Sequence, residues 1–240
     1  MITWVNNMGR IVAIAGGTFQ STEAINKKAL EITGSENPKV LFVPTAHRDD
    51  AKYIREFKVV FEGLGAEVRT LELTKNEYSD AEIDKLIAWM DMIYVGDGNA
   101  VYMMNTWRKY NLDKKLRAVF SSDHAVLAGN GAGCTCWFSC GYSNSQFYGG
   151  KSDWQYIWAD EMLDFHHTAV CPHYTDEERA NFDRRLLEKE IPGYALEDHV
   201  ALVQVDQHTE FLACHPKAKA WYLIYLNGRL MKEEIHLNYI

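Results

Sequence analysis

Residues 127–138 read LAGNGAGCTCWF and have the outline of a strand that enters a sharp glycine turn and continues as a helix. Many hydrolases hold their nucleophile at such a turn, which strains its central residue and aims the next backbone N–H at the oxyanion. The stretch 129–133, GNGAG, fits the pattern G-x-S-x-G with Gly131 in place of the serine. The sequence therefore predicts the geometry of a nucleophile elbow without a nucleophilic side chain.

Short apolar runs alternate with amphipathic segments on both sides of this stretch. Apolar runs of the kind that form buried strands span 10–15, 39–46, 66–73, 91–96 and 124–129. Segments with helical spacing, several of them with a capping residue such as Ser21, Thr22 or Ser79 at the start, span 21–34, 49–65, 79–90 and 100–111. Such alternation predicts a parallel sheet with helices on both faces.

The pattern changes after about residue 140. An aromatic, glycine-rich stretch leads to an apolar run ending in CPHY (171–174), a charged helix is predicted over 176–191, and three apolar runs follow. The last run contains Asn227-Gly228 between alternating residues, a strong signal for a β-hairpin. We expect a single domain over residues 1–240: a three-layer α/β fold with a mostly parallel sheet and an antiparallel C-terminal extension.

Composition limits the classes of partner. The 240 residues carry a net charge of −8, and Lys and Arg are scattered through predicted helices, so no basic stripe for nucleic acid can be assembled. No leader-like segment and no run of about 18 apolar residues occurs, which predicts a cytoplasmic protein without a membrane partner. Five cysteines, an odd number with three crowded into 134–140, indicate reduced thiols.

Three glycine-rich peptides follow predicted strands: AGGTFQST (15–22), VGDGNAVY (95–102) and AGNGAGCT (128–135). In parallel sheets, loops and helix starts at the carboxyl ends of the strands converge on one crevice. The sequence predicts that these peptides meet there, although strand-to-helix turns also favour small residues for steric reasons alone.

Several motifs in order resemble peptidase family S51, the dipeptidase E type, whose fold is that of class I glutamine amidotransferase-like domains. The matching stretches are AGGT, VPTA, YVGDGNAVYMM, AGNGAGCTCWF, CPHY, LEDHVALV and KAKAWYLIYLNGRL. The resemblance implies hydrolysis of dipeptides with an N-terminal aspartate by a serine, a histidine base and an acidic partner, without a cofactor or a metal.

The resemblance assigns roles position by position. It implies that His173 is the base, that Gly131 stands at the serine position, and that Asn144 stands at the acidic position, with Asp153 as a possible substitute. Arg179 corresponds to the arginine that recognises the aspartyl carboxylate, a role suited to its bidentate fork.

The resemblance also implies the oxyanion donors. These are backbone N–H groups around Gly96 to Gly98 and at Ala132. Asp97 replaces a usual glycine, and its carboxylate near the hole would disfavour a developing oxyanion.

Cys134 is the alternative nucleophile, since it lies about one helical turn after Gly131, where it would pair with His173. The competing interpretation is that Cys134 is a small apolar residue packing the elbow helix. A zinc site from Cys134, Cys136 and Cys140 lacks the usual second ligand pair, so no metal is predicted.

Three functional hypotheses follow. The first is an S51 homologue, a serine-protease-like pseudoenzyme with impaired catalysis that retains a pocket for a small peptide or an acidic small molecule. The second is a working Asp-Xaa dipeptidase or amidohydrolase that uses Cys134 or water activated by His173. The third is an interaction protein that uses the aromatic stretch 141–158 as its surface. The sequence leaves the oligomeric state open.

Overall fold

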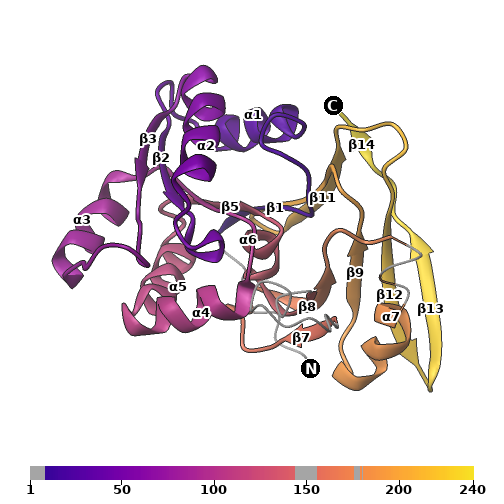
Figure 1. Ribbon diagram of the computed structural model, residues 1–240. Helices are drawn as coiled ribbons and strands as arrows, with labels where there is room; N and C mark the ends of the chain where they lie inside the picture. Colours follow the sequence, from indigo (N-terminus) through magenta and orange to yellow (C-terminus); the bar gives the residue numbers. More distant parts are fainter. Residues whose placement is uncertain (1–8, 144–155, 176–178, 180) are drawn as a thin grey trace.

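The computed structural model describes residues 9–143, 156–175, 179 and 181–240. These residues form a mixed α/β fold with an eight-stranded and a six-stranded sheet (Figure 1). The predicted α/β class is confirmed. The second sheet is a feature that the sequence analysis did not anticipate.

The eight-stranded sheet has the order β14-β11-β10-β1-β5-β4-β2-β3. Strands β1, β5, β4, β2 and β3 run parallel, β10 lies antiparallel beside β1, and β11 lies antiparallel beside β10. The bounds are β1 Arg10–Ile14, β2 Lys39–Val43, β3 Glu67–Thr70, β4 Met92–Val95, β5 Val126–Asn130, β10 Val200–Val205, β11 His208–Ala213 and β14 Asn238–Tyr239.

Helices follow the parallel strands as the apolar spacing predicts. Ser79 and Glu82 form a capping box at the start of α3, and the Asp50 carboxylate accepts two backbone N–H bonds at the start of α2. Thr22 stands at the N-cap of α1, but its side chain makes no capping bond. The bounds are α1 Glu23–Ile32, η1 Thr45–His47, α2 Ala51–Gly63, α3 Asp80–Trp89, α4 Ala100–Lys109, α5 Leu112–Ser122 and α6 Ala132–Thr135.

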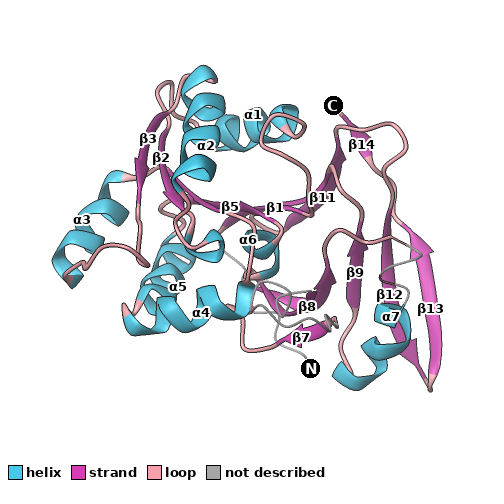
Figure 2. Cartoon of the chain, in the orientation of Figure 1, coloured by secondary structure: helices cyan, strands magenta, loops and turns pink. Residues whose placement is uncertain are grey.

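The two faces of the eight-stranded sheet bury different helices, because side chains alternate along each strand. Val12 and Ile14 of β1 pack in one cluster with residues of α1 and α2. Ile11 and Ala13 pack in a second cluster with residues of α3, α4 and α5. Figure 2 shows α1 and α2 on one side of the sheet and α4 and α5 on the other.

The six-stranded sheet has the order β13-β12-β9-β8-β6-β7. We expected the C-terminal strands to extend the first sheet. Only β10, β11 and β14 do so, whereas the hairpin β12–β13 pairs with β9 in the second sheet. The bounds are β6 Phe138–Ser143, β7 Ile157–Ala159, β8 His166–Cys171, β9 Gly193–Leu196, β12 Ala220–Leu226 and β13 Arg229–Glu234.

The hairpin turn has the predicted form, since Asn227 and Gly228 both have positive φ angles, 53° and 74°. The charged helix predicted over 176–191 is observed in part, as α7 (Asn181–Arg185) followed by the 3-10 turn η3 (Leu186–Lys189). Within the described ranges, no helix has the length and apolar character needed to cross a membrane.

Three stacked aromatic rings between helix α2 and the sheet form part of the core on this face. The rings of Phe42 and Phe57 stack with centroids 3.8 Å apart, and those of Phe57 and Phe61 with centroids 4.0 Å apart. All three side chains are fully buried. Removing the central ring leaves a cavity that rigid neighbours on both sides cannot fill.

We therefore expect Phe57→Ala to lower the free energy of unfolding by about 3–5 kcal/mol. Val59→Ala on the same helix is the matched control, because Val59 is 73% exposed and its truncation should change stability by less than about 0.5 kcal/mol. Urea denaturation of both variants measures the difference. Equal losses would contradict the assignment of the core to this stack.

Candidate active site

The stretch 129–133 forms the predicted elbow between β5 and α6. Gly131 has φ 55° and ψ −107°, a backbone conformation that is costly for any residue with a side chain. Its N–H donates to the carbonyl of Ile14 at the end of β1, which ties the elbow to the neighbouring strand. The elbow geometry is present, and at its tip glycine is free of the strain that a serine would store.

The carboxylate of Asp97 occupies the volume that a side chain at position 131 would need. A Cβ atom built on Gly131 would lie 1.9 Å from Oδ1 and 2.1 Å from Cγ of Asp97. A serine at this position and the observed Asp97 rotamer therefore exclude one another.

The same carboxylate occupies the predicted oxyanion hole. Oδ1 of Asp97 accepts hydrogen bonds from the N–H of Gly98 at 2.7 Å and from the N–H of Ala132 at 2.8 Å. These are two of the donors that the sequence analysis assigned to the hole. Gly96, the third, donates its N–H to the carbonyl of Val43 at 3.2 Å instead, so it is engaged in the sheet and its predicted role is wrong.

His173 follows β8 and faces Asp97 from the second sheet. Its Nε2 lies 3.4 Å from Oδ2 of Asp97, and its Nδ1 lies 2.7 Å from Oδ1 of Asp198. The three side chains form a line, acid–imidazole–acid, in which Asp97 stands where a triad has its nucleophile. About 30% of the Asp97 and 31% of the His173 side chain is exposed, so both can be reached from solvent.

Local backbone features hold His173 and Asp198 in place. His173 has φ 51°, a left-handed conformation that is uncommon for residues with a side chain. A Cβ on Gly16, just after β1, would lie 2.2 Å from Nδ1 of His173 and 2.1 Å from Oδ1 of Asp198. The absence of a side chain at Gly16 thus lets the pair pack against the carboxyl end of β1.

Each of the three groups favours the charged form of its neighbour. Burial alone would lower the pKa of His173, but its hydrogen bonds to Asp198 and Asp97 outweigh burial and raise that pKa to about 9. Burial would raise the pKa of Asp97, yet the bonds from His173, Ala132 and Gly98 lower it. The hydrogen bond from His173 likewise lowers the pKa of Asp198. At neutral pH the site therefore holds an imidazolium between two carboxylates.

The contact between Asp198 and His173 has no signal in the local sequence. The stretch LEDHVALV, which contains Asp198, matched the family pattern as a C-terminal strand, and the match gave Asp198 no role in the site. The acid reaches the site because β10 pairs antiparallel with β1, which brings the turn before β10 to the carboxyl end of β1, where the N–H of His199 donates to the carbonyl of Gly16. Asn144 and Asp153, the predicted acidic positions, lie outside the described residues.

Cys134 is not placed as a nucleophile. Its side chain is fully buried in the core cluster between the sheet and helix α4. Burial and the nearby charge of Asp97 raise the pKa of its thiol far above neutrality. The packing interpretation of Cys134 is the one that fits this environment.

Arg179 is buried beside the end of β6. Its guanidinium donates to the carbonyl of Tyr142 at 3.0 Å and lies over the ring of Tyr156, 4.7 Å from the centroid. Only 3% of the residue is exposed. The predicted contact between Arg179 and a substrate carboxylate stays a prediction. Within the described part of the chain, no group of three or more His, Cys, Asp or Glu residues is arranged to hold a metal ion.

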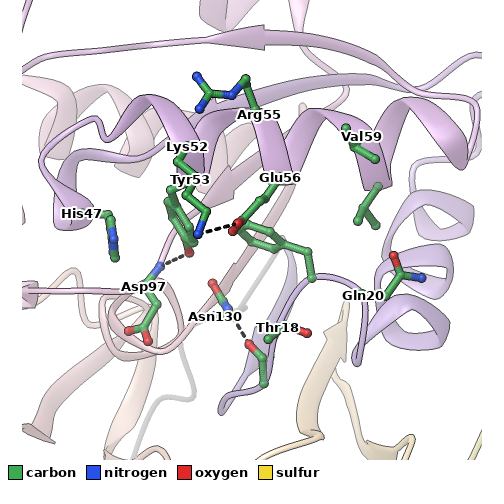
Figure 3. A pocket seen from close by; sticks show the side chains of 13 residues that line it. Thr18, Gln20, His47, Lys52, Tyr53, Arg55, Glu56, Val59, Asp97 and Asn130 are labelled. Carbon is green, nitrogen blue, oxygen red and sulfur yellow. Dashed lines mark hydrogen bonds and ion pairs between the residues drawn. The ribbon is translucent and has the colours of Figure 1, made fainter.

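A cavity of about 740 Å³ adjoins the elbow (Figure 3). Helix α2 contributes Lys52, Tyr53 and Glu56 to one wall, and the loop after β1 contributes the opposite wall. At its inner end lie Asp97, whose N–H donates to the Tyr53 hydroxyl at 2.9 Å, and Asn130. The full lining comprises Gly17, Thr18, Phe19, Gln20, His47, Lys52, Tyr53, Arg55, Glu56, Val59, Val60, Asp97 and Asn130.

Asn130 presents an acceptor at this inner end. The residue is 3% exposed, and its amide nitrogen donates to the carbonyl of Gly17 at 3.3 Å. Its Oδ1 has no hydrogen-bond partner among the described residues. A buried acceptor of this kind is satisfied when water or a ligand donates to it.

The elbow, the two backbone donors and the His–Asp pair are set on a parallel sheet with helices on both faces, an arrangement typical of proteins built on a nucleophile elbow. The sequence profile of peptidase family S51 matches residues 11–212, and the chain belongs to this family.

Individual relatives agree with the family assignment. The chain is 29% identical over 240 residues to the uncharacterized peptidase YgaJ of Bacillus subtilis (strain 168), an alignment that covers 97% of this chain and all of that protein. The fold matches the crystal structure of a peptidase from an acI-B1 actinobacterium, with a TM-score of 0.72 at 17% identity over 96% of this chain and 98% of that one. It also matches a protein from Listeria monocytogenes EGD-e named as a candidate peptidase E, with a TM-score of 0.64 at 17% identity over 87% of this chain and all of that one.

The raised pKa of His173 makes stability depend on pH. The imidazole has an ordinary pKa of 6.5 and a pKa of about 9 in the folded protein, so the folded state binds the proton more tightly. The resulting stabilisation is fully present below pH 6.5 and is lost as the pH rises through about 9. We expect the free energy of unfolding, measured by urea denaturation, to fall over this interval.

His173→Gln is the control for this dependence, because glutamine keeps a polar side chain without a titrating group. The decline between pH 6.5 and 9 should be much shallower in this variant. NMR titration of the His173 ring provides an independent reading, and Asp97→Asn should move its midpoint downward from about 9. A wild-type midpoint near the ordinary value would contradict the acid–imidazole–acid arrangement.

Proposed function

We propose that this S51 protein is a catalytically impaired peptidase homologue that retains a pocket for a small ligand. The observation that carries the proposal is the position of Asp97, whose carboxylate fills both the serine volume and the oxyanion hole. A peptide carbonyl needs the hole for its developing oxyanion, and a carboxylate already bonded to both donors excludes it. The loss thus extends beyond the missing serine hydroxyl.

The rest of the site retains the histidine and acid of a hydrolase site. His173 and Asp198 keep the hydrogen bond that orients a catalytic base. Since the imidazole stays charged while Asp97 is ionised, it is a poor base at neutral pH. A water molecule activated by His173 as general base is therefore not expected to hydrolyse peptides efficiently.

The cavity beside the elbow supports ligand binding. Its outer part carries the cationic side chains of Lys52 and Arg55, with Glu56 pairing to Lys52 at 3.7 Å, and its inner part offers the acceptor of Asn130. A small acidic peptide matches this distribution, with carboxylates at the cationic rim and a donor toward Asn130.

Hydrolysis of Asp-p-nitroanilide tests the catalytic half of the proposal. We expect the wild-type protein and Gly131→Ser to be inactive, because a serine at 131 collides with Asp97 while the hole stays filled. The double variant Asp97→Gly with Gly131→Ser should exceed either by about 100-fold or more, since it restores the nucleophile and opens the hole together. Asp97→Gly alone, which opens the hole without a nucleophile, is the matched control.

Turnover by the wild-type protein at the rate of the double variant would contradict the proposal. Activity of Gly131→Ser alone would show that Asp97 moves aside at little cost. Circular dichroism spectra of all variants establish that each one is folded.

Thermal unfolding with an Asp-Xaa dipeptide tests the binding half. At a ligand concentration of about 100 times Kd the folded state gains about 2.7 kcal/mol, a shift of several degrees in Tm. Lys52→Ala combined with Arg55→Ala should reduce the shift, whereas Lys58→Ala, on the same helix but outside the cavity lining, should leave it unchanged. Equal shifts in both variants would place the peptide elsewhere.

A further inference from the structure

The two oxygens of the Asp97 carboxylate have different surroundings. Oδ1 is held by two backbone N–H groups at 2.7 and 2.8 Å, whereas Oδ2 lies 3.4 Å from Nε2 of His173. The side chain is 30% exposed, so an incoming molecule can reach it. A carboxylate with one oxygen fixed by donors and the other facing an acid–base group is arranged as a nucleophile rather than as a packing residue.

The contents of the oxyanion hole restrict the reaction that it can serve. While Oδ1 occupies the hole, no acyl oxygen of a substrate can enter it. The carbon whose oxyanion the hole can stabilise is therefore Cγ of Asp97 itself. A tetrahedral oxyanion forms at this carbon when water attacks an ester of Asp97, so the hole is suited to hydrolysing an aspartyl ester.

We propose that Asp97 is a covalent nucleophile toward small epoxides, which this protein opens to diols through an aspartyl ester. This inference goes beyond the proposed function, and it does not depend on the binding of acidic peptides. An epoxide fits the arrangement because it offers an sp³ carbon to the carboxylate. Opening of its ring turns the ring oxygen into an alkoxide, which needs a proton. The imidazolium of His173, with Nε2 3.4 Å from Oδ2, can supply that proton.

In the first step Oδ2 of Asp97 attacks a ring carbon of the epoxide. A C–O bond forms between Oδ2 and that carbon, and the ring C–O bond breaks with its electron pair on oxygen. That oxygen takes the proton from Nε2 of His173. The products are a neutral hydroxyalkyl ester of Asp97 and a neutral imidazole, so charge and atoms balance.

In the second step the neutral His173 removes a proton from water as the water oxygen bonds to Cγ of Asp97. The oxyanion develops on Oδ1, where the N–H groups of Gly98 and Ala132 already point. Collapse breaks the bond between Cγ and Oδ2, and the departing diol oxygen takes the proton held by His173. The carboxylic acid left behind returns its proton to His173, which restores the starting state.

The charge of Asp97 explains how one histidine can serve both steps. The ionised carboxylate favours the imidazolium, which is the form that donates a proton in the first step. Esterification removes that negative charge, so the pKa of His173 falls and the imidazole becomes a base when water must be activated. Asp198 holds the ring in one orientation throughout, through its 2.7 Å bond to Nδ1.

The adjoining cavity suits a small, mainly apolar electrophile. Its lining includes Phe19, Tyr53, Val59 and Val60, and it extends to Asp97 at its inner end. A volume of about 740 Å³ accommodates an aryl or alkyl epoxide together with the water consumed in the second step.

Isotope labelling with styrene oxide as the probe tests the proposal. In a single turnover in ¹⁸O-water, with the protein in excess, the diol should be unlabelled and the peptide containing Asp97 should carry ¹⁸O. This pattern arises because the diol receives its new oxygen from the carboxylate and water replaces that oxygen afterwards. Label in the diol, with none in Asp97, would mean direct attack by water and would overturn the proposal.

Trapping of the ester provides a second measurement. His173→Gln lacks both the proton donor of the first step and the base of the second. With solvent as its proton donor the ester should form more slowly but should not be hydrolysed, so the variant should gradually gain the mass of one styrene oxide, located at Asp97 by peptide mapping and removed by hydroxylamine. Asp198→Asn should accumulate the same ester to a smaller extent, because it keeps the imidazole without its orienting acid. An unmodified Asp97 in both folded variants would overturn the proposal.

Asp164 supplies the matched control. Its carboxylate also bonds to a histidine, with Oδ1 3.0 Å from Nδ1 of His167, but it lies on the surface outside the oxyanion hole. Asp164→Asn should leave adduct formation unchanged, whereas Asp97→Asn should abolish it. Equal loss in both variants, or adducts spread over many carboxylates, would contradict a specific nucleophile. Peptide hydrolysis is measured separately, so failure here leaves the proposed function standing.

Discussion

The site depends on a single steric constraint, which is that one small volume at the tip of the elbow can hold either a side chain at position 131 or the carboxylate of Asp97. The structure resolves the conflict with a glycine at 131 and the carboxylate in the oxyanion hole. From this choice follow the second carboxylate beside His173 and the closure of the hole to acyl oxygens. The sheet positions these residues, and the group that fills this volume determines which reactions the site can support.

Much of the first sheet could be predicted because its signals are local. Each apolar run between 10 and 130 became a parallel strand, and Ser79 caps its helix through contacts three residues away. The second sheet could not be predicted in this way. Its hairpin was recognised from Asn227-Gly228, yet the choice of β9 as its neighbour depends on pairing across sequence distances that periodicity does not encode.

In the candidate site, too, the features with local signals could be predicted and those that depend on distant strands could not. The elbow and the histidine were visible in short motifs, and Asp97 was recognised as a carboxylate near the hole. That it enters the hole could not be read from the sequence, because the rotamer of Asp97 depends on the empty space above Gly131, which comes from another strand. Asp198 was missed for the same reason, since only the antiparallel pairing of β10 with β1 brings it to His173.

The steric exclusion between the two positions also constrains the history of the chain. A side chain at 131 would place a Cβ atom against the Asp97 carboxylate in its observed rotamer, so a serine there would require Asp97 to leave the oxyanion hole. In a chain descended from a serine-bearing elbow, the carboxylate could take its present place only once position 131 had lost its side chain.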